Sequence, residues 1–194
     1  MSIESMRNLT GMKLVRPAKP DRVRARIALV ENGERLCSLA QPQRDASSAV
    51  VSESITAPKI IGHEHVWVDL FFVDDPQAIP LGTLEGRKEV VLAMKRMKNW
   101  NSVYTLNPVL PAAFLRALAG QAGIHIYSNR DDTLYASRSY LTLAADKAGR
   151  RTVMLPHRCD VFEPFSGEAL WRGITQFESI FRAKEVVIWR LELA

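Results

Sequence analysis

Two adjacent carboxylates, Asp131 and Asp132, follow His125 after a short apolar run. Two carboxylates can hydrolyse a glycosidic bond when they lie about 5 to 9 Å apart on either side of it. Neighbouring residues of a strand point to opposite faces of a sheet, and aspartate is frequent in turns. The sequence therefore favours a turn at this position, and we identify no catalytic residue.

The motif His63-Glu64-His65 could place two imidazoles on one face of a strand. Such a pair can begin a zinc site, but at least one further ligand is needed. The other histidines, His125 and His157, have no suitable spacing. We therefore expect a polar patch here and no metal.

The cysteines and glycines give no sign of a nucleophile or a cofactor. Cys37 and Cys159 lack a CxxC neighbour, so we expect two reduced thiols, with a disulfide between them as the alternative. Neither cysteine lies in a tight strand-to-helix turn with a histidine nearby. The segment GTLEGR, 82–87, has neither dinucleotide-binding nor Walker spacing. We expect no cofactor.

Aromatic residues offer the remaining candidates for ligand binding, because aromatic faces suit sugars and other amphipathic ligands. Aromatic residues make up 8% of the chain, so most of them can equally be core residues. Trp100, Tyr104 and Tyr135 are the three that we select as candidate ligand-binding residues.

The charge distribution argues against a specific nucleic-acid partner. Residues 1–30 hold seven Lys and Arg against two acidic residues, whereas the rest of the chain holds 19 of each. The net charge of +5 thus belongs to a proline-containing leader that we expect to be flexible. No apolar run is long enough to cross a membrane or to form a signal peptide. We expect a cytoplasmic protein.

The elements that must position these residues fall into three parts. We expect a basic leader over 1–25, a mixed α/β region over 26–124 and a small antiparallel β-domain over 125–194. In the middle region, Pro111 and Gly123 bracket a helix whose apolar face includes Phe114 and Leu115. Short apolar runs predict strands at 26–31, before the turn Asn32-Gly33, and at 49–56, 65–76, 89–97 and 101–107. After residue 124, short β-type runs separated by polar turns predict the strands of a small sandwich; the runs are IHIYS, TLYAS, YLTLAAD, RTVML, DVFEPF and EVVIWRLEL.

The segments FFVDDPQAIPLG, LRALAGQAGIHIY and GRRTVMLPHRCDVFEPFSGE resemble the C-terminal part of bacterial trimeric β-galactosidase-type glycoside hydrolases. In that family, a catalytic barrel precedes a flavodoxin-like, amidotransferase-like trimerisation domain and a small β-domain. The resemblance covers roughly residues 65–194 and implies an α+β fold: a partial flavodoxin-like segment followed by a small antiparallel β-sandwich. No residue of this chain corresponds to the barrel or to its catalytic carboxylates.

The sequence therefore predicts a non-catalytic assembly region of a glycoside-hydrolase-like protein, truncated or standing alone. Its partners would be copies of itself or a barrel-containing chain, because the apolar strand over 66–73 and the helix face over 114–122 need cover. A carbohydrate-binding module that uses exposed aromatics is the alternative, and an enzyme in its own right is the third reading.

Overall fold

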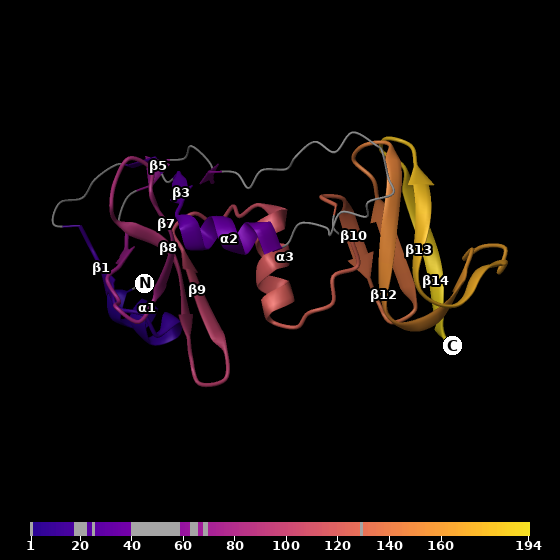
Figure 1. Ribbon diagram of the computed structural model, residues 1–194, viewed down its shortest axis with the longest axis horizontal. Helices are drawn as coiled ribbons and strands as arrows, with labels where there is room; N and C mark the ends of the chain where they lie inside the picture. Colours follow the sequence, from indigo (N-terminus) through magenta and orange to yellow (C-terminus); the bar gives the residue numbers. More distant parts are fainter. Residues whose placement is uncertain are drawn as a thin grey trace. The chain divides into compact units, whose positions relative to one another are not determined.

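The structure is a computed structural model that describes residues 2–17, 23–24, 26–39, 59–62, 66–67, 70–128 and 130–194. The chain forms two compact units, Met1–Ala117 and Leu118–Ala194 (Figure 1). The boundary therefore precedes the predicted one after residue 124. The predicted strand at 49–56 and the HEH motif lie outside the described residues.

Unit 1 is built on a seven-stranded sheet in which every described strand pair is antiparallel. The strand order is β1-β6-β8-β7-β3-β4, and β9 also pairs with β8. A separate ladder joins β2 (Val23–Arg24) to β5 (Val66–Trp67). The strands of the large sheet are β1 (Leu14–Val15), β3 (Ile27–Leu29), β4 (Ile60–Ile61), β6 (Phe72–Val73), β7 (Ile79–Leu84), β8 (Val90–Arg96) and β9 (Asn101–Thr105).

This sheet gives no support to the predicted flavodoxin-like segment, which would need parallel strands joined by crossover helices. Short connections join β7 to β8 and β8 to β9 and reverse the chain, so these neighbours must run antiparallel. Strand β7 also continues to Leu84, so the predicted turn at 82–87 begins only at Glu85.

The predicted leader over 1–25 is wrong for its first part, which belongs to the fold of unit 1. Helix α1 (Ile3–Thr10) begins after Ser2, whose side chain accepts a hydrogen bond from a backbone N–H of the first turn. After it, Met12 and Leu14 are buried, and β1 pairs with β6. The segment folds although it is basic, because burial of its apolar residues is favourable and its charged side chains remain in water at the surface.

The carboxylate of Asp75 fixes this N-terminal segment to the sheet. Its oxygens accept hydrogen bonds from the Lys95 Nζ at 2.7 Å, the Lys13 backbone N–H at 3.0 Å and the Gln77 backbone N–H at 2.9 Å. The Lys95 Nζ also donates to the Gly11 carbonyl oxygen at 2.8 Å. One carboxylate thereby connects β8, the turn after β6 and the chain that leaves α1.

Helix α2 (Glu31–Leu39) occupies the place where Asn32-Gly33 was predicted to form a turn. A Cβ atom on Gly33 would lie 2.1 Å from the Leu81 carbonyl oxygen of β7. The glycine is therefore needed for close packing of the helix on a strand. In the sequence, Asn-Gly is also typical of a turn, which is why a turn was predicted here.

The predicted helix between Pro111 and Gly123 is confirmed as α3 (Ala112–Gln121). Gly123 ends it with a left-handed φ of 71°, as its position after the last turn predicted. Phe114 is buried, but Leu115 is half exposed, so the predicted buried face is wrong at that position.

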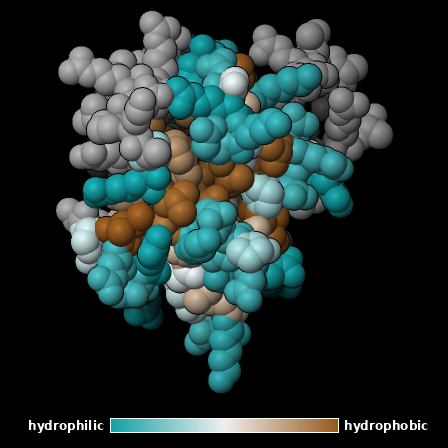
Figure 2. Space-filling model, turned by 90° about the vertical axis from the view of Figure 1, so that its left-hand side faces the viewer, coloured by the Kyte–Doolittle hydropathy of each residue, from teal (hydrophilic) through white to brown (hydrophobic). Residues whose placement is uncertain are grey.

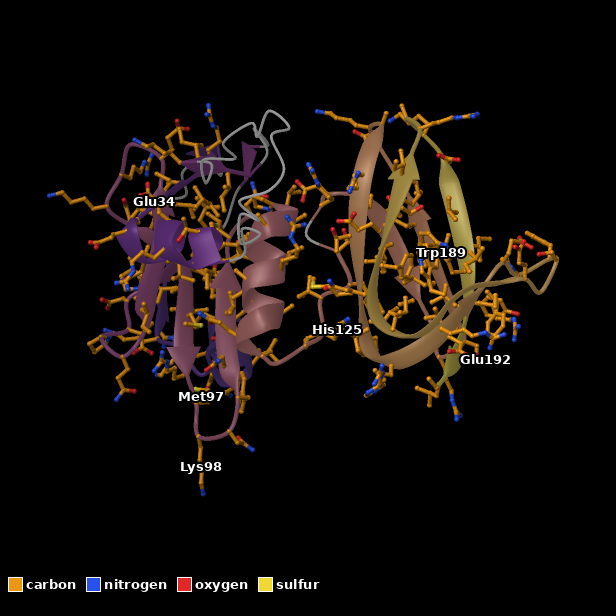
Figure 3. The ribbon with its side chains drawn as sticks, turned by 45° about the vertical axis from the view of Figure 1, so that its right-hand side comes forward. Glu34, Met97, Lys98, His125, Trp189 and Glu192 are labelled. Carbon is orange, nitrogen blue, oxygen red and sulfur yellow. The ribbon has the colours of Figure 1, made fainter. Side chains whose placement is uncertain are left out.

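Unit 2 is a five-stranded antiparallel sheet with the strand order β10-β11-β14-β12-β13. Its strands are β10 (Thr133–Ala136), β11 (Tyr140–Ala144), β12 (Gly149–Phe162), β13 (Ala169–Phe181) and β14 (Val186–Leu193). The sheet encloses a core in which Trp189 lies edge-on to Phe177 and Phe181 (Figure 3). This confirms the β-rich, sandwich-like architecture predicted for the end of the chain.

Strand β12 joins two apolar runs that the sequence suggested as separate strands. Met154 pairs with Gln176 and Cys159 pairs with Ile174, so four residues of β12 oppose one residue of β13. Pro156 lies in this bulge, since it has no N–H to donate to a ladder. Beyond the bulge β12 pairs with β14 as well as β13.

Candidate interaction surface

Asp132, the residue that first suggested hydrolytic chemistry, forms a buried ion pair. The Arg151 Nε and Nη2 donate to its carboxylate, as does the Asp146 backbone N–H at 3.1 Å. The same guanidinium donates to the Lys147 carbonyl oxygen at 2.7 Å. Asp132 thus fixes the chain before β10 to the hairpin between β11 and β12. A carboxylate held in this way has a structural role, as the turn interpretation implied.

His125 also has a structural partner. Its Nε2 lies 2.9 Å from the Met154 carbonyl oxygen, and its ring lies edge-on to Tyr127. The Met154 backbone N–H donates to the Tyr127 carbonyl oxygen at 2.9 Å. The predicted strand IHIYS is therefore a segment that follows one side of β12 without being a regular strand.

The three aromatic candidates do not form one site. Tyr104 is buried in the core of unit 1 and donates its hydroxyl hydrogen to the Phe71 carbonyl oxygen at 2.8 Å. Burial raises the pKa of Tyr104 to about 12. Its selection as a ligand-binding residue was wrong, because a buried side chain cannot stack on a ligand. Trp100 is half exposed in the β8–β9 hairpin, where its carbonyl oxygen accepts a hydrogen bond from the Met97 backbone N–H at 2.8 Å.

Tyr135 is 70% exposed on β10, and the sheet places it among other exposed apolar residues. Tyr135 lies opposite Thr142 of β11, which in turn lies opposite Ile188 of β14. The intervening residues of β11 and β14 face the core. We call the resulting surface the outer face; its members are Tyr135, Tyr140, Thr142, Ala144, Val186 and Ile188.

Four members of the outer face carry most of its exposed apolar area. Tyr140 is 48% exposed, Val186 59% and Ile188 39%, in addition to Tyr135. Large apolar side chains gathered on one exposed sheet face indicate a surface that another molecule covers. Val186 and Ile188 were not among the candidate residues predicted from the sequence. The unbroken apolar run VVIW could have indicated them, since a strand with one wet face should alternate.

One end of the outer face is charged. The Arg190 guanidinium lies 4.3 Å from the ring centre of Phe162, and that of Arg172 lies 5.8 Å from the same ring. Arg172 donates to Asp160 at 3.1 Å, and Arg190 pairs with Glu192. An apolar centre beside charged residues is the usual anatomy of a protein interface.

Other kinds of site find little support in the part of the chain that the structure describes. No group of three His, Cys, Asp or Glu residues there could hold a metal ion, and no helix there has the length and apolarity to cross a membrane. Cys37 and Cys159 are both buried without a disulfide. Burial raises the pKa of each thiol, and the Asp160 charge adds to this at Cys159. Neither thiol is therefore an activated nucleophile.

Comparison with known proteins gave no match: no protein family, no curated protein and no solved structure is significantly similar to this chain.

Proposed function

We propose that this chain is a non-catalytic assembly region of a cytoplasmic, glycoside-hydrolase-like protein. In this proposal the outer face of unit 2 binds a further copy of the chain or a barrel-containing partner chain. The link to glycoside hydrolases rests on the resemblance of three sequence segments within residues 65–194 to the C-terminal part of trimeric β-galactosidase-type proteins.

The observation that carries the proposal is the composition of the outer face. Two of its four large exposed side chains, Val186 and Ile188, are aliphatic. Aliphatic side chains gain by excluding water from another apolar surface, at roughly 25 cal/mol for each Å² buried. Unit 1 adds a further apolar area: on the face seen in Figure 2, apolar side chains gather centrally among polar ones.

A carbohydrate-binding module is the second candidate, and one observation favours it. Tyr135 and Tyr140 are both exposed on the outer face, and exposed tyrosine rings can stack on sugar rings. The neighbouring Val186 and Ile188 offer no hydrogen bond to sugar hydroxyls, and we therefore rank this function below assembly.

Light scattering over a concentration series tests the proposal. We expect a mass above the 21.8 kDa of one chain. The double variant Tyr135→Ser/Ile188→Ser should associate more weakly, so its oligomer should need a higher concentration to form than that of the unchanged protein. Phe165→Ser is the matched control, because Phe165 is 90% exposed in the turn between β12 and β13. A monomer at all concentrations would refute self-association.

A thermal-shift screen with saccharides separates the two candidate functions. A ligand that binds only the folded state raises the unfolding temperature by mass action. An assembly region should show no shift. A shift that is lost in Tyr135→Ser would replace assembly with carbohydrate binding.

A further inference from the structure

Strand β13 ends the sheet of unit 2, and its outer edge is the feature from which we infer a specific mode of assembly. Among the described strands, β13 pairs with β12 alone. Its second half, from Gln176 to Phe181, pairs with β12 without a register shift. A regular edge strand of this length presents backbone N–H and C=O groups to any strand that approaches.

The contacts of Met154 show which residues of β13 present those groups. Met154 directs its backbone N–H and C=O to Tyr127 and His125, away from β13. Its partner Gln176 must then be in a non-hydrogen-bonded pair with β12, because the two kinds of pair alternate along an antiparallel ladder. The backbone groups of Gln176, Glu178 and Ile180 therefore point to the outer edge.

The first half of β13 is protected against such pairing, and the second half is not. Gly173 has a left-handed φ of 58°, and its backbone groups bind Arg158 and Asp160. Irregular backbone of this kind is a common protection of an edge strand. In the second half, Glu178 is bound by Arg150 of β12 at 2.7 Å, and Ile180 is 75% exposed.

We propose that the second half of β13 pairs antiparallel with the β13 of a second copy, so that the two sheets become continuous about a two-fold axis. Only residues with outward backbone groups can lie opposite one another as hydrogen-bonded pairs. With the axis at Ile180, the two Ile180 residues form the central hydrogen-bonded pair, and the Glu178 side chain lies near that of Arg182 of the second copy. The backbone groups of Arg182 are bound to Glu185 of their own chain, so this outer contact is between side chains. With the axis at Glu178, like charges would lie opposite each other, which is unfavourable.

This inference rests on the proposed assembly function and adds a second contact surface, the edge of β13, to the outer face. The second copy is the partner because the charges and the apolar residue of this edge are self-complementary. Arg182 is exposed directly after the strand ends, so its side chain is available to Glu178 of the second copy.

The variant Ile180→Pro tests the pairing without breaking the fold of one chain. The N–H at position 180 points outward, so proline removes a donor to the second copy and none to β12. Two symmetric hydrogen bonds are lost in the dimer, and we expect the dissociation constant to rise about thirtyfold. The far-UV circular dichroism of the variant should match that of the unchanged chain.

Disulfide crosslinking tests the register. The two Ile180 Cα atoms would lie about 5.5 Å apart, which is within the range that a disulfide bridges. We expect Ile180→Cys to give a covalent dimer under mild oxidation. Phe165→Cys, more exposed in the same unit, is the control for random collision and should crosslink more slowly. Faster crosslinking at 165 would overturn the inference.

The same measurements separate this inference from the proposed function. Weaker association of Ile180→Pro supports pairing through β13, and weaker association of Tyr135→Ser/Ile188→Ser separately supports contact through the outer face. An oligomer that is lost in the double variant and retained in Ile180→Pro overturns the β13 inference and leaves assembly through the outer face in place. A monomer throughout overturns both.

Discussion

Replacement of Asp132 by asparagine would test whether the buried ion pair holds unit 2 together. The side chains of Asp132 and Arg151 are 4% and 6% exposed. Asparagine keeps the shape but removes the charge that balances the guanidinium. Removal of one partner from a buried pair costs about 3 to 5 kcal/mol. Because Arg151 keeps the Lys147 carbonyl oxygen as an acceptor, we expect the lower end, about 3 kcal/mol.

Hydrogen exchange on the full chain is the suitable assay, because a chain of two units need not unfold in one step. Amides of β11 and β12 should exchange faster in Asp132→Asn by a factor that corresponds to this loss, whereas amides of β8 in unit 1 should be unchanged. Asp131→Asn is the matched control: its side chain is exposed, and we expect an effect within about 0.5 kcal/mol.

Equal, small effects of the two substitutions would refute the argument that the buried pair fixes this part of the fold. A further check is Asp132→Leu combined with Arg151→Met. Apolar replacement of both partners often restores stability, so the double variant should be more stable than Asp132→Asn.

Three further predictions concern single residues. Tyr104→Phe should destabilise unit 1 by about 1 to 3 kcal/mol, since it removes the hydroxyl that donates to the part-buried Phe71 carbonyl oxygen. Hydrogen exchange of β8 amides measures this loss, and an unchanged rate would contradict it. Lys184→Gly should stabilise the chain by up to about 1 kcal/mol, because Lys184 has a left-handed φ of 63° that glycine adopts without strain. Thermal unfolding measures this change. A lower unfolding temperature of the variant would show that the ion pair between Lys184 and Asp146 contributes more than the strain costs. Burial disfavours the charged form of Asp75, but the hydrogen bonds from Lys95 and two backbone N–H groups outweigh burial and lower its pKa. Since the folded pKa lies below the unfolded value of about 3.9, this stabilisation is present above that pH and is lost as the pH falls through the folded pKa. Asp75→Asn should thus be less stable than the unchanged chain at pH 7, and the difference in stability should shrink as the pH falls below about 3.9. A difference that does not shrink would refute the assignment.

Local signals were sufficient for some elements. The spacing of apolar residues between Pro111 and Gly123 predicted α3, and short β-type runs predicted β8, β9, β11 and β14. In each case the periodicity and the residues that end the element lie within one short segment.

The same signals were misleading where a distant contact decides the structure. Strand β13 was not predicted, because most of its side chains are exposed or only partly buried and Gly173 interrupts the pattern. Asn32-Gly33 resembled a hairpin turn, although Gly33 is required by its contact with Leu81. The selection of Tyr104 as a ligand-binding residue failed for the same reason, since its burial depends on packing against residues far along the chain.

The sequence alone determined that the chain ends in a β-rich unit, because this follows from short β-type runs and the polar turns between them. Only the tertiary structure decided that Asp132 holds Arg151, that Tyr135 shares a face with Ile188, and that β13 lies at an edge. These relations arise from strand order and register, which bring together residues from separate segments. Burial and pairing of this kind depend on long-range contacts, which the pattern of any single segment does not contain.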